Sequence, residues 1–331
     1  MGEKDIVEKS LEDYDDVFAD IINGLLFGGE MVIRNDELEE LHPVSEYRSD
    51  NATSHAQERD VVKRWKKNLI NVAVIGVENQ SSIDQQMPIR VISYDAGAYR
   101  RQLADHEARM RLWRKEEKQF NKPENQEQLE MQETRKKLTK PVFCPIPVTT
   151  LILYFGKEHW QKKTRLKEII EIPERLEPYV SDYKINVFEI SWLSDEQISY
   201  FKSDFGIVAN FFAKKRRDPE YIPDDLTGMI HPDEVLKLIA AVVGDMRYLK
   251  VNDLNKESKV KNMCEVADRL VNMGKAEGRE EGKKEGLKEG IKRGELKTLI
   301  ELVKDGILTL SDAARRAEMT EAAFKTAVGI K

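Results

Sequence analysis

The sequence predicts an α/β protein that becomes entirely helical toward its C-terminus. Three runs rich in β-branched and aromatic residues are typical of strands: residues 69–80, 148–155 and 185–190. A long helical pattern that opens at Met87 lies between the first two runs. From residue 194 onward only helical patterns follow. This order of elements predicts an α/β or α+β core with a helical second part.

The composition is that of a folded but polar protein. The chain has 331 residues, 40% hydrophobic and 34% charged, enough for a large core or for two domains and a tail. Its net charge of -6 gives no overall attraction to nucleic acid, so DNA binding would need local basic patches. Cys144 and Cys264 lie far apart, which argues against a disulfide framework or a zinc site. The sequence has no signal-peptide or membrane-span pattern, so we expect a cytoplasmic protein without a membrane partner.

The first predicted element is a helix over residues 13–27, where apolar residues recur at helical spacing and Gly28 predicts the end. Residues 31–33 are expected as a short strand and residues 35–57 as a loop. Asp20 lies on the inner half of this helix. Its carboxylate is a candidate third ligand of a metal site, or alternatively a cap or a surface ion pair.

The strand over residues 69–80 carries the main functional clue, because it ends in Glu78, Asn79 and Gln80. Side chains alternate along a strand, so Glu78 and Gln80 point to the same face, and Asp60 lies shortly upstream. Carboxylate oxygens bind hard divalent ions such as Mg²⁺, which polarise a phosphate and lower the pKa of an attacking water. Asp60 and Glu78 are therefore candidate metal ligands, and Gln80 is a candidate for orienting water or phosphate.

Each of these residues also has a plainer interpretation. Glu78 and Gln80 fit the polar end of a buried strand that contacts solvent. Asp60 fits a surface ion pair with Lys63 or Arg64. The spacing alone does not decide between the metal site and these alternatives.

The helix that follows the strand supplies second-line candidates on or near one flank. They could reach a phosphate, or they could simply pack and carry surface charge; they are Arg90, Tyr94, Asp95, Tyr99 and Arg100. Residues 114–140 contain few apolar residues, so they either extend this helix into solvent or form a mobile excursion.

Further helices are expected in the polar stretch between the last two strands and after them, at residues 157–172, 195–203, 205–215 and 233–248. The chain then changes character. A glycine recurs every fourth residue among Glu and Lys, at Gly274, Gly278, Gly282, Gly286, Gly290 and Gly294. Six glycines weaken a helix by about 5 kcal/mol relative to alanine. This segment is therefore either a helix covered by another helix or a flexible spacer.

The end of the chain predicts a small helical unit similar to a helix-turn-helix. Leu296 to Val303 and residues 308–328 are helical in pattern, with Ser311 and Thr320 as expected N-caps. Such a unit contacts DNA in some proteins and only packs in others. The expected parts are residues 1–215, 216–273, 274–295 and 296–331.

Four blocks of sequence occur in a characteristic order: FADIINGLLFGG, ERDVVKRW, GVENQSSIDQQMPIRVISYDAGAYR, and PVTTLILYFG with a following Trp160. In this order they resemble the family of recombination-promoting nucleases and transposase-like proteins of the PD-(D/E)xK superfamily. The resemblance covers roughly residues 13–215, and the glycine-rich charged tail is similar to that of family members. It implies a restriction-endonuclease-like core, a central mixed sheet flanked by helices, with the order helix, three strands, helix and strand.

The same resemblance implies roles for individual residues. Asp60 takes the place of the motif aspartate, Glu78 that of the second acidic ligand, and Gln80 the position where the superfamily usually has lysine. Asp20 matches the acidic position of the first helix. The step from Asp60 to Glu78 is long for a hairpin of two short strands. Two aspartates further along the chain are therefore alternatives for the first ligand; these are Asp84 and Asp95.

These observations lead to one expected function and one alternative. The expected function is a DNA endonuclease that depends on Mg²⁺ (or Mn²⁺), hydrolyses phosphodiester bonds and is linked to recombination or mobile elements. A homodimer would suit double-strand cutting. The alternative is a non-catalytic DNA-binding or interaction protein that retains the nuclease scaffold. Metal binding through Asp60 and Glu78 distinguishes the two.

Overall fold

The structure is a computed structural model, and it describes residues 11–41, 44–48, 54–58, 60–68, 70–120, 139–252 and 259–328. The chain divides into two compact units, residues 1–267 and residues 268–331. The first unit contains the sheets and most of the helices, and the second unit is helical.

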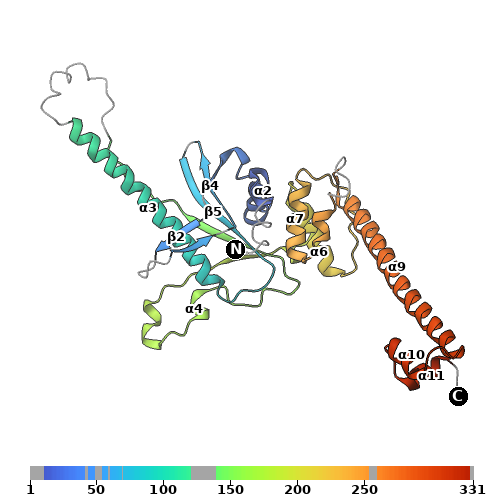
Figure 1. Cartoon of the computed structure of the whole chain (residues 1–331). Coiled ribbons are helices and arrows are strands. Elements are labelled where there is room, and N and C mark those ends of the chain that lie inside the picture. The colour runs from blue at the N-terminus through green and yellow to red at the C-terminus, as the bar shows by residue number, and fades with distance from the viewer. Residues whose placement is uncertain are drawn as a thin grey trace. The chain divides into compact units, whose positions relative to one another are not determined.

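A mixed, open, five-stranded sheet forms the centre of the first unit (Figure 1). Across this sheet the strands follow in the order β1 (Leu38–Glu40), β4 (Val61–Lys67), β5 (Ile70–Gln80), β6 (Val148–Tyr154) and β7 (Asn186–Glu189). The neighbours β1 and β4, and β4 and β5, are antiparallel, whereas β5, β6 and β7 run parallel. The predicted α/β class is confirmed, as are the three predicted strands, which correspond to β5, β6 and β7.

The helices of the first unit are α2 (Asp15–Phe27), α3 (Met87–Phe120), α4 (Leu166–Ile169), α5 (Asp195–Ile198), α6 (Phe205–Arg217), α7 (Pro232–Val243) and α8 (Arg247–Lys250). Short 3-10 helices are η1 (Asn35–Glu37), η3 (Glu174–Tyr179) and η4 (Ile190–Trp192). The long helix α9 (Met263–Lys304) begins in the first unit and continues in the second, where α10 (Leu310–Arg316) and α11 (Glu321–Val328) follow.

Some local predictions were wrong for identifiable reasons. The stretch 35–57, expected as a loop, contains β1 and a separate two-stranded sheet of β2 (Val44–Arg48) and β3 (Ser54–Glu58). These strands are short and polar, so no apolar alternation marks them. Residues 31–33 do not form a strand, because the Asn23 side chain bonds the backbone N–H and C=O of Ile33.

The predicted helix over residues 157–172 is also wrong, since only Leu166–Ile169 is helical there. The helix predicted over residues 195–203 is shorter, and the one over residues 233–248 is divided at Gly244, whose φ of 76° ends α7 in the left-handed region. In the predicted excursion, α3 extends to Phe120, and residues 121–138 lie outside the described residues.

The helices α2 and α3 cover opposite faces of the sheet (Figure 1). On one face, Lys63 of β4 contacts Asp13 and Asp15 at the start of α2. On the other face, Thr150 of β6 donates a hydrogen bond to Asp95 of α3 at 2.7 Å. Because α3 connects the parallel strands β5 and β6, both strands end at the same edge of the sheet. Glu78 and Gln80 lie at this edge.

The second unit has a small apolar core of its own. Ala313, Ala314 and Phe324 are buried there, against partly buried residues of α9 that include Leu296 and Ile300. Thr309, and not the predicted Ser311, caps α10 through a 3.2 Å hydrogen bond from the N–H of Asp312. The other predicted cap, Thr320, accepts the N–H of Ala323 at 3.3 Å. Within the described part of the chain, no helix has the length and apolar character that a membrane span requires.

The glycine repeat is helical and forms the middle of α9. A Cβ built at any of its six glycines would meet no atom of the described chain within 4 Å, apart from the helix's own neighbouring backbone. The predicted helix is therefore present, and the covering helix is not supplied by the described residues of this chain. The glycines consequently act on stability through backbone entropy alone.

Substitution of Gly278 by alanine is expected to stabilise the second unit by about 1 kcal/mol, because alanine restricts the unfolded chain and meets no neighbour. The opposite result is expected for Gly24→Ala in α2, where the new Cβ would lie 2.4 Å from the Phe201 ring. Chemical denaturation followed by circular dichroism measures both changes. A destabilising Gly278→Ala would show that this stripe is packed against another molecule.

Candidate functional site

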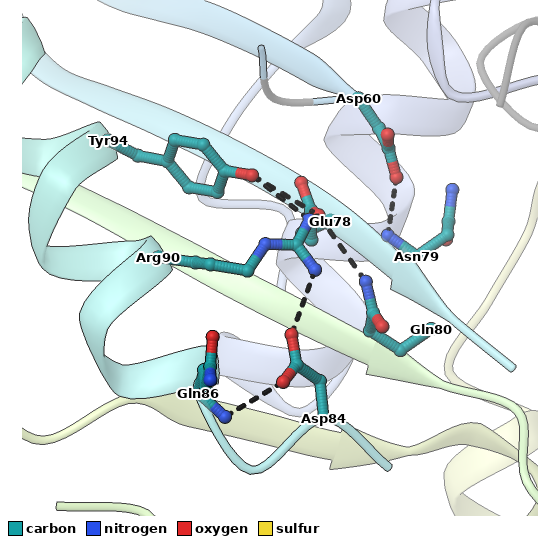
Figure 2. Close-up of polar contacts among 8 residues, drawn as sticks. All are labelled: Asp60, Glu78, Asn79, Gln80, Asp84, Gln86, Arg90 and Tyr94. Carbon is teal, nitrogen blue, oxygen red and sulfur yellow. Dashed lines mark hydrogen bonds and ion pairs between the residues drawn. The ribbon is translucent and has the colours of Figure 1, made fainter. Parts of the chain in front are cut away.

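Asp60 immediately precedes β4 and faces the end of β5. The register pairs Val61 with Val77, so continuation of the antiparallel ladder brings Asp60 beside Glu78 and Asn79. The half-buried Asp60 accepts a 2.7 Å hydrogen bond from the backbone N–H of Asn79 (Figure 2). The first strand pair thus holds the carboxylate of Asp60 at the edge where β5 ends.

The length of the two strands explains the long step between Asp60 and Glu78. Strand β4 has seven residues and β5 has eleven, and the register shifts at a bulge between Trp65 and Lys66. The hairpin is therefore built from long strands, which accommodates the step from Asp60 to Glu78. A displaced first ligand is not needed to bring a carboxylate to Glu78.

Glu78 is the buried centre of the site. It is only 2% exposed, and it points to the face of the sheet that α3 covers. Gln80, on the same face, donates through Nε2 to Glu78 Oε1 at 3.3 Å (Figure 2). The predicted common orientation of these two side chains is thus confirmed. The interpretation of Glu78 as a solvent-facing strand end is wrong, because its side chain is buried.

Arg90 brings the positive charge of the site from the first turn of α3. Its guanidinium donates to Glu78 Oε1, to Asp84 Oδ2 at 3.2 Å and to the Tyr94 hydroxyl at 3.1 Å. Burial works against the charged form of Arg90, but the charge of Glu78, together with Tyr94 and Asp84, outweighs it and raises the pKa of the guanidinium above its usual value. Arg90 is still 37% exposed, so part of its cation faces solvent.

Tyr94 lies one helical turn after Arg90, and its hydroxyl also faces the Glu78 carboxylate. Its hydroxyl is 3.5 Å from Glu78 Oε1, and the Arg90 guanidinium lies 5.9 Å from the centre of its ring. Burial, and then the charge of Glu78, raise the pKa of Tyr94 to about 12. Tyr94 therefore remains a neutral phenol near neutral pH and serves as a hydrogen-bond donor.

A carboxyl group that the sequence did not single out lies on the other side of Asn79. Glu12, just before the turn that leads into α2, is completely buried, and its Oε1 accepts the side-chain N–H of Asn79 at 3.2 Å. Burial, with a smaller contribution from the charge of Asp60, raises the pKa of Glu12 to about 8. Asn79 thus bonds Asp60 through its backbone and Glu12 through its side chain.

No pattern in the sequence distinguishes Glu12 from its neighbours. It belongs to an acidic segment with Asp13, Asp15 and Asp16, any of which fits the exposed start of a helix. The contacts of Lys63 fix the local conformation of this acidic segment. This fully buried lysine donates to the carbonyl of Asp13 and to the carboxylate of Asp15, and so fixes the turn that directly follows Glu12.

Lys63 and Arg64 therefore do not take the role predicted for them as ion-pair partners of Asp60. Arg64 pairs instead with Glu39 of β1 at 2.9 Å. Consecutive residues of β4 point to opposite faces, which separates the two cations from each other. Both contribute to the folding of the sheet around the site.

The structure does not bring Asp20 to the other candidate ligands. Its carboxylate accepts hydrogen bonds from the backbone N–H groups of Lys202 and Ser203 and from the Ser203 hydroxyl, at 2.7–2.9 Å. Asp20 thus fixes the loop before α6. These contacts are neither the helix cap nor the surface ion pair that the sequence left open, because Lys202 and Ser203 lie in the loop before the N-cap of α6.

The remaining candidates fall into two groups. Asp84 pairs with Arg90 and accepts the N–H of Gln86, so it belongs to the rim of the site. Asp95 is buried away from it, where it accepts hydrogen bonds from the hydroxyls of Thr150 and Tyr183.

Further along α3, the Tyr99 hydroxyl accepts a hydrogen bond from the backbone N–H of Val148 at 3.1 Å. Tyr99 therefore binds the start of β6 and does not contact Glu78. Arg100 lies exposed next to Tyr99. The first turns of this flank therefore face the site, through Arg90 and Tyr94, whereas its later turns pack against β6.

The donor set at the edge of β5 has the chemistry of a hard-cation site. Asp60 and Glu78 supply carboxylate oxygens. The buried Glu12 Oε2 and Asn79 Oδ1 also have no hydrogen-bond partner among the described residues, but the Asn79 side chain points to the face opposite Glu78 and burial keeps Glu12 protonated near neutral pH, so neither belongs to this donor set. The described residues nevertheless contain no group of three or more His, Cys, Asp or Glu side chains already arranged around one point. Two carboxylates fit a divalent ion, provided that Glu78 exchanges its bond to Arg90 for the ion.

Comparison of the chain with protein-family models, with curated proteins and with solved structures finds no match. The function is therefore argued from the geometry of the site and from the motifs of the sequence.

Proposed function

We propose that the protein is a DNA endonuclease that uses Mg²⁺ or Mn²⁺ to hydrolyse phosphodiester bonds. One observation carries this proposal. The long β4–β5 hairpin places Asp60 beside the end of the strand that bears Glu78 and Gln80, three residues that the motif resemblance assigns to a nuclease site. A core that is restriction-endonuclease-like fits the mixed sheet with α2 and α3 on opposite faces.

Asp60 and Glu78 would hold the ion in this proposal. A bound divalent ion supplies Lewis acidity, which polarises the scissile phosphate and makes a bound water more acidic. Gln80, hydrogen-bonded to Glu78, orients the water or a phosphate oxygen through its amide. An amide carries no charge, so it cannot replace the lysine found at this position in related motifs.

Arg90 provides the positive charge that Gln80 lacks. Its guanidinium already lies on the same face and bonds the same Glu78 oxygen as Gln80. Release from Glu78 frees its N–H groups to bind a phosphate oxygen, for which the planar guanidinium is well suited. Tyr94 and Asp84 keep the side chain near this position.

One observation favours the alternative function, a DNA-binding or interaction protein that keeps the scaffold without catalysis. The ion pair of Arg90 with Glu78 neutralises the buried carboxylate without any metal. Such a site would be stable and inert. In this alternative the helical second unit makes the contact with DNA.

Metal-dependent cleavage tests the proposal. The purified protein is expected to convert supercoiled plasmid to nicked and linear forms with Mg²⁺ or Mn²⁺, and to leave it intact with a chelator. Isothermal titration with Mn²⁺ is expected to show binding that Asp60→Asn weakens and Asp20→Asn preserves, because Asp20 contacts Lys202 and Ser203 instead. An intact plasmid together with the absence of metal binding would favour the scaffold.

A further inference from the structure

The segment between β6 and α4 begins beside the proposed site. Gln80 and Tyr154 are register partners at the ends of the parallel strands β5 and β6, and Phe155 donates its N–H to the carbonyl of Gln80 at 2.9 Å. Register partners share a face, so Tyr154 lies on the same face as Glu78. Whatever follows Phe155 in the chain therefore starts at the edge of the site.

The chain turns back closely over Tyr154 at this point. A Cβ at Gly156 would lie 1.9 Å from the Tyr154 hydroxyl, so only glycine allows this approach. Trp160 then packs edge-on against the Tyr154 ring, with centroids 5.2 Å apart and planes at 82°. These contacts hold the segment on the face of the sheet that carries the site.

Two further contacts fix the same segment. The backbone N–H of Trp160 donates to Glu189 Oε1 at 2.6 Å, and the ring of His159 stacks on Trp192 with centroids 3.4 Å apart. The Arg216 guanidinium lies 3.7 Å from the centre of the same indole, so His159 and Arg216 must occupy its two faces. The backbone of residues 156–160 is thereby ordered, with its exposed side chains left in solvent.

Between β6 and α4 the exposed side chains include four cations, at Lys157, Lys162, Lys163 and Arg165, and one acid, Glu158. Lys157, Lys162 and Lys163 are exposed, and in the described residues none of them forms a hydrogen bond or an ion pair. The next two cations differ, because Arg165 pairs with Asp182 and Lys167 pairs with Glu177. The three lysines are thus available to an anionic partner.

We propose that Lys157, Lys162 and Lys163 form a contact surface for the phosphate backbone of a nucleic acid whose scissile bond lies at Glu78. This inference rests on the proposed function for the position of the substrate. A chain of net charge -6 repels a polyanion, so association needs a local concentration of positive charge. Lysine ammonium groups are hydrated point charges that suit backbone contacts without reading the base sequence.

The salt dependence of binding distinguishes this surface from a general charge effect. Each lysine that contacts a phosphate contributes about 0.9 to the slope of log K against log salt concentration. The variant with Lys157, Lys162 and Lys163 all changed to Gln is expected to bind a fluorescein-labelled DNA duplex at least about 10-fold more weakly, with a slope reduced by about 2 to 3. The anisotropy titrations contain a chelator, so that no cleavage occurs.

A charge-matched variant provides the control. Lys67, Lys115 and Lys118 are also exposed, but Lys67 lies at the opposite end of β4 and the other two lie in the last turns of α3. Their replacement by Gln removes the same charge and is expected to change the affinity less than about 3-fold and to leave the slope nearly unchanged. Thermal melts of both variants establish that they are folded.

Plasmid cleavage in parallel separates this inference from the proposed function. Weak binding by the first variant and normal binding by the control support the surface, whether or not the wild-type protein cleaves. If the wild-type protein cleaves the plasmid and the first variant binds the duplex as tightly as wild type, the contact surface is overturned and the nuclease function stands. A wild-type protein that does not bind the duplex, or equal losses in both variants, would also overturn the surface.

Discussion

Replacement of Glu78 by Gln is expected to reduce plasmid cleavage at least about 100-fold, the largest effect on activity that we foresee. Glutamine keeps the shape of the side chain but removes the charge that a divalent ion and Arg90 both need. Arg90 then lacks its main anionic partner, although Asp84 still binds it. The rate of nicking in Mg²⁺, measured with a thermal melt to verify folding, gives the result directly.

A substitution at Asp84 is the matched control. Asp84 also binds Arg90, is an acidic side chain on the rim, and is not placed as a metal ligand. Asp84→Asn is therefore expected to lower the rate less than about 10-fold. Equal rates for the Glu78→Gln variant and the wild-type protein would remove Glu78 from the mechanism.

The second large effect concerns stability and comes from Glu12. Its pKa of about 8 in the folded protein lies above the ordinary value of 4.5, because burial disfavours the carboxylate. The folded state therefore retains a proton that the unfolded chain loses as the pH rises. The contribution of Glu12 to stability is complete below about pH 4.5 and decreases until about pH 8, by up to about 1.4 kcal/mol for each pH unit.

Glu12→Gln is expected to remove this dependence, because glutamine resembles the protonated side chain and does not titrate. Urea denaturation without divalent ions, from about pH 5 to pH 8, should show the variant gaining stability relative to wild type as the pH rises. Glu30→Gln, at an exposed carboxylate after α2, controls for the loss of an acidic residue. A constant difference between wild type and Glu12→Gln would contradict a buried, protonated Glu12.

The sequence identified Asp60 and Glu78 as candidate site residues, but it did not identify the buried Glu12. Alternation along a strand is a local property, so the common face of Glu78 and Gln80 followed from the spacing. Glu12 is distant in sequence from Asn79, and only the packing of α2 on the sheet joins them. Burial of an acid depends on what covers it, which a helical pattern does not specify.

Asp20 illustrates the opposite case. Its position on the first helix fitted a ligand or a cap equally well, and the tertiary structure gives it the N–H groups of Lys202 and Ser203. Arg90 was a second-line candidate among several polar residues of one helix flank. The first turn of α3 begins close to the end of β5, and this geometry selects Arg90 and Tyr94 over Tyr99.

The sequence by itself determined the α/β class, the buried strand that ends in Glu78 and Gln80, the long helix after it and the helical character of the tail. Each of these follows from periodicity or from residue propensities within a short window. Only the tertiary structure decided that Asp60 meets Asn79, that Glu12 is buried, that Asp20 fixes a distant loop and that the segment after β6 begins at the edge of the site. Those outcomes depend on strand register and on helix packing, which join residues far apart in the chain.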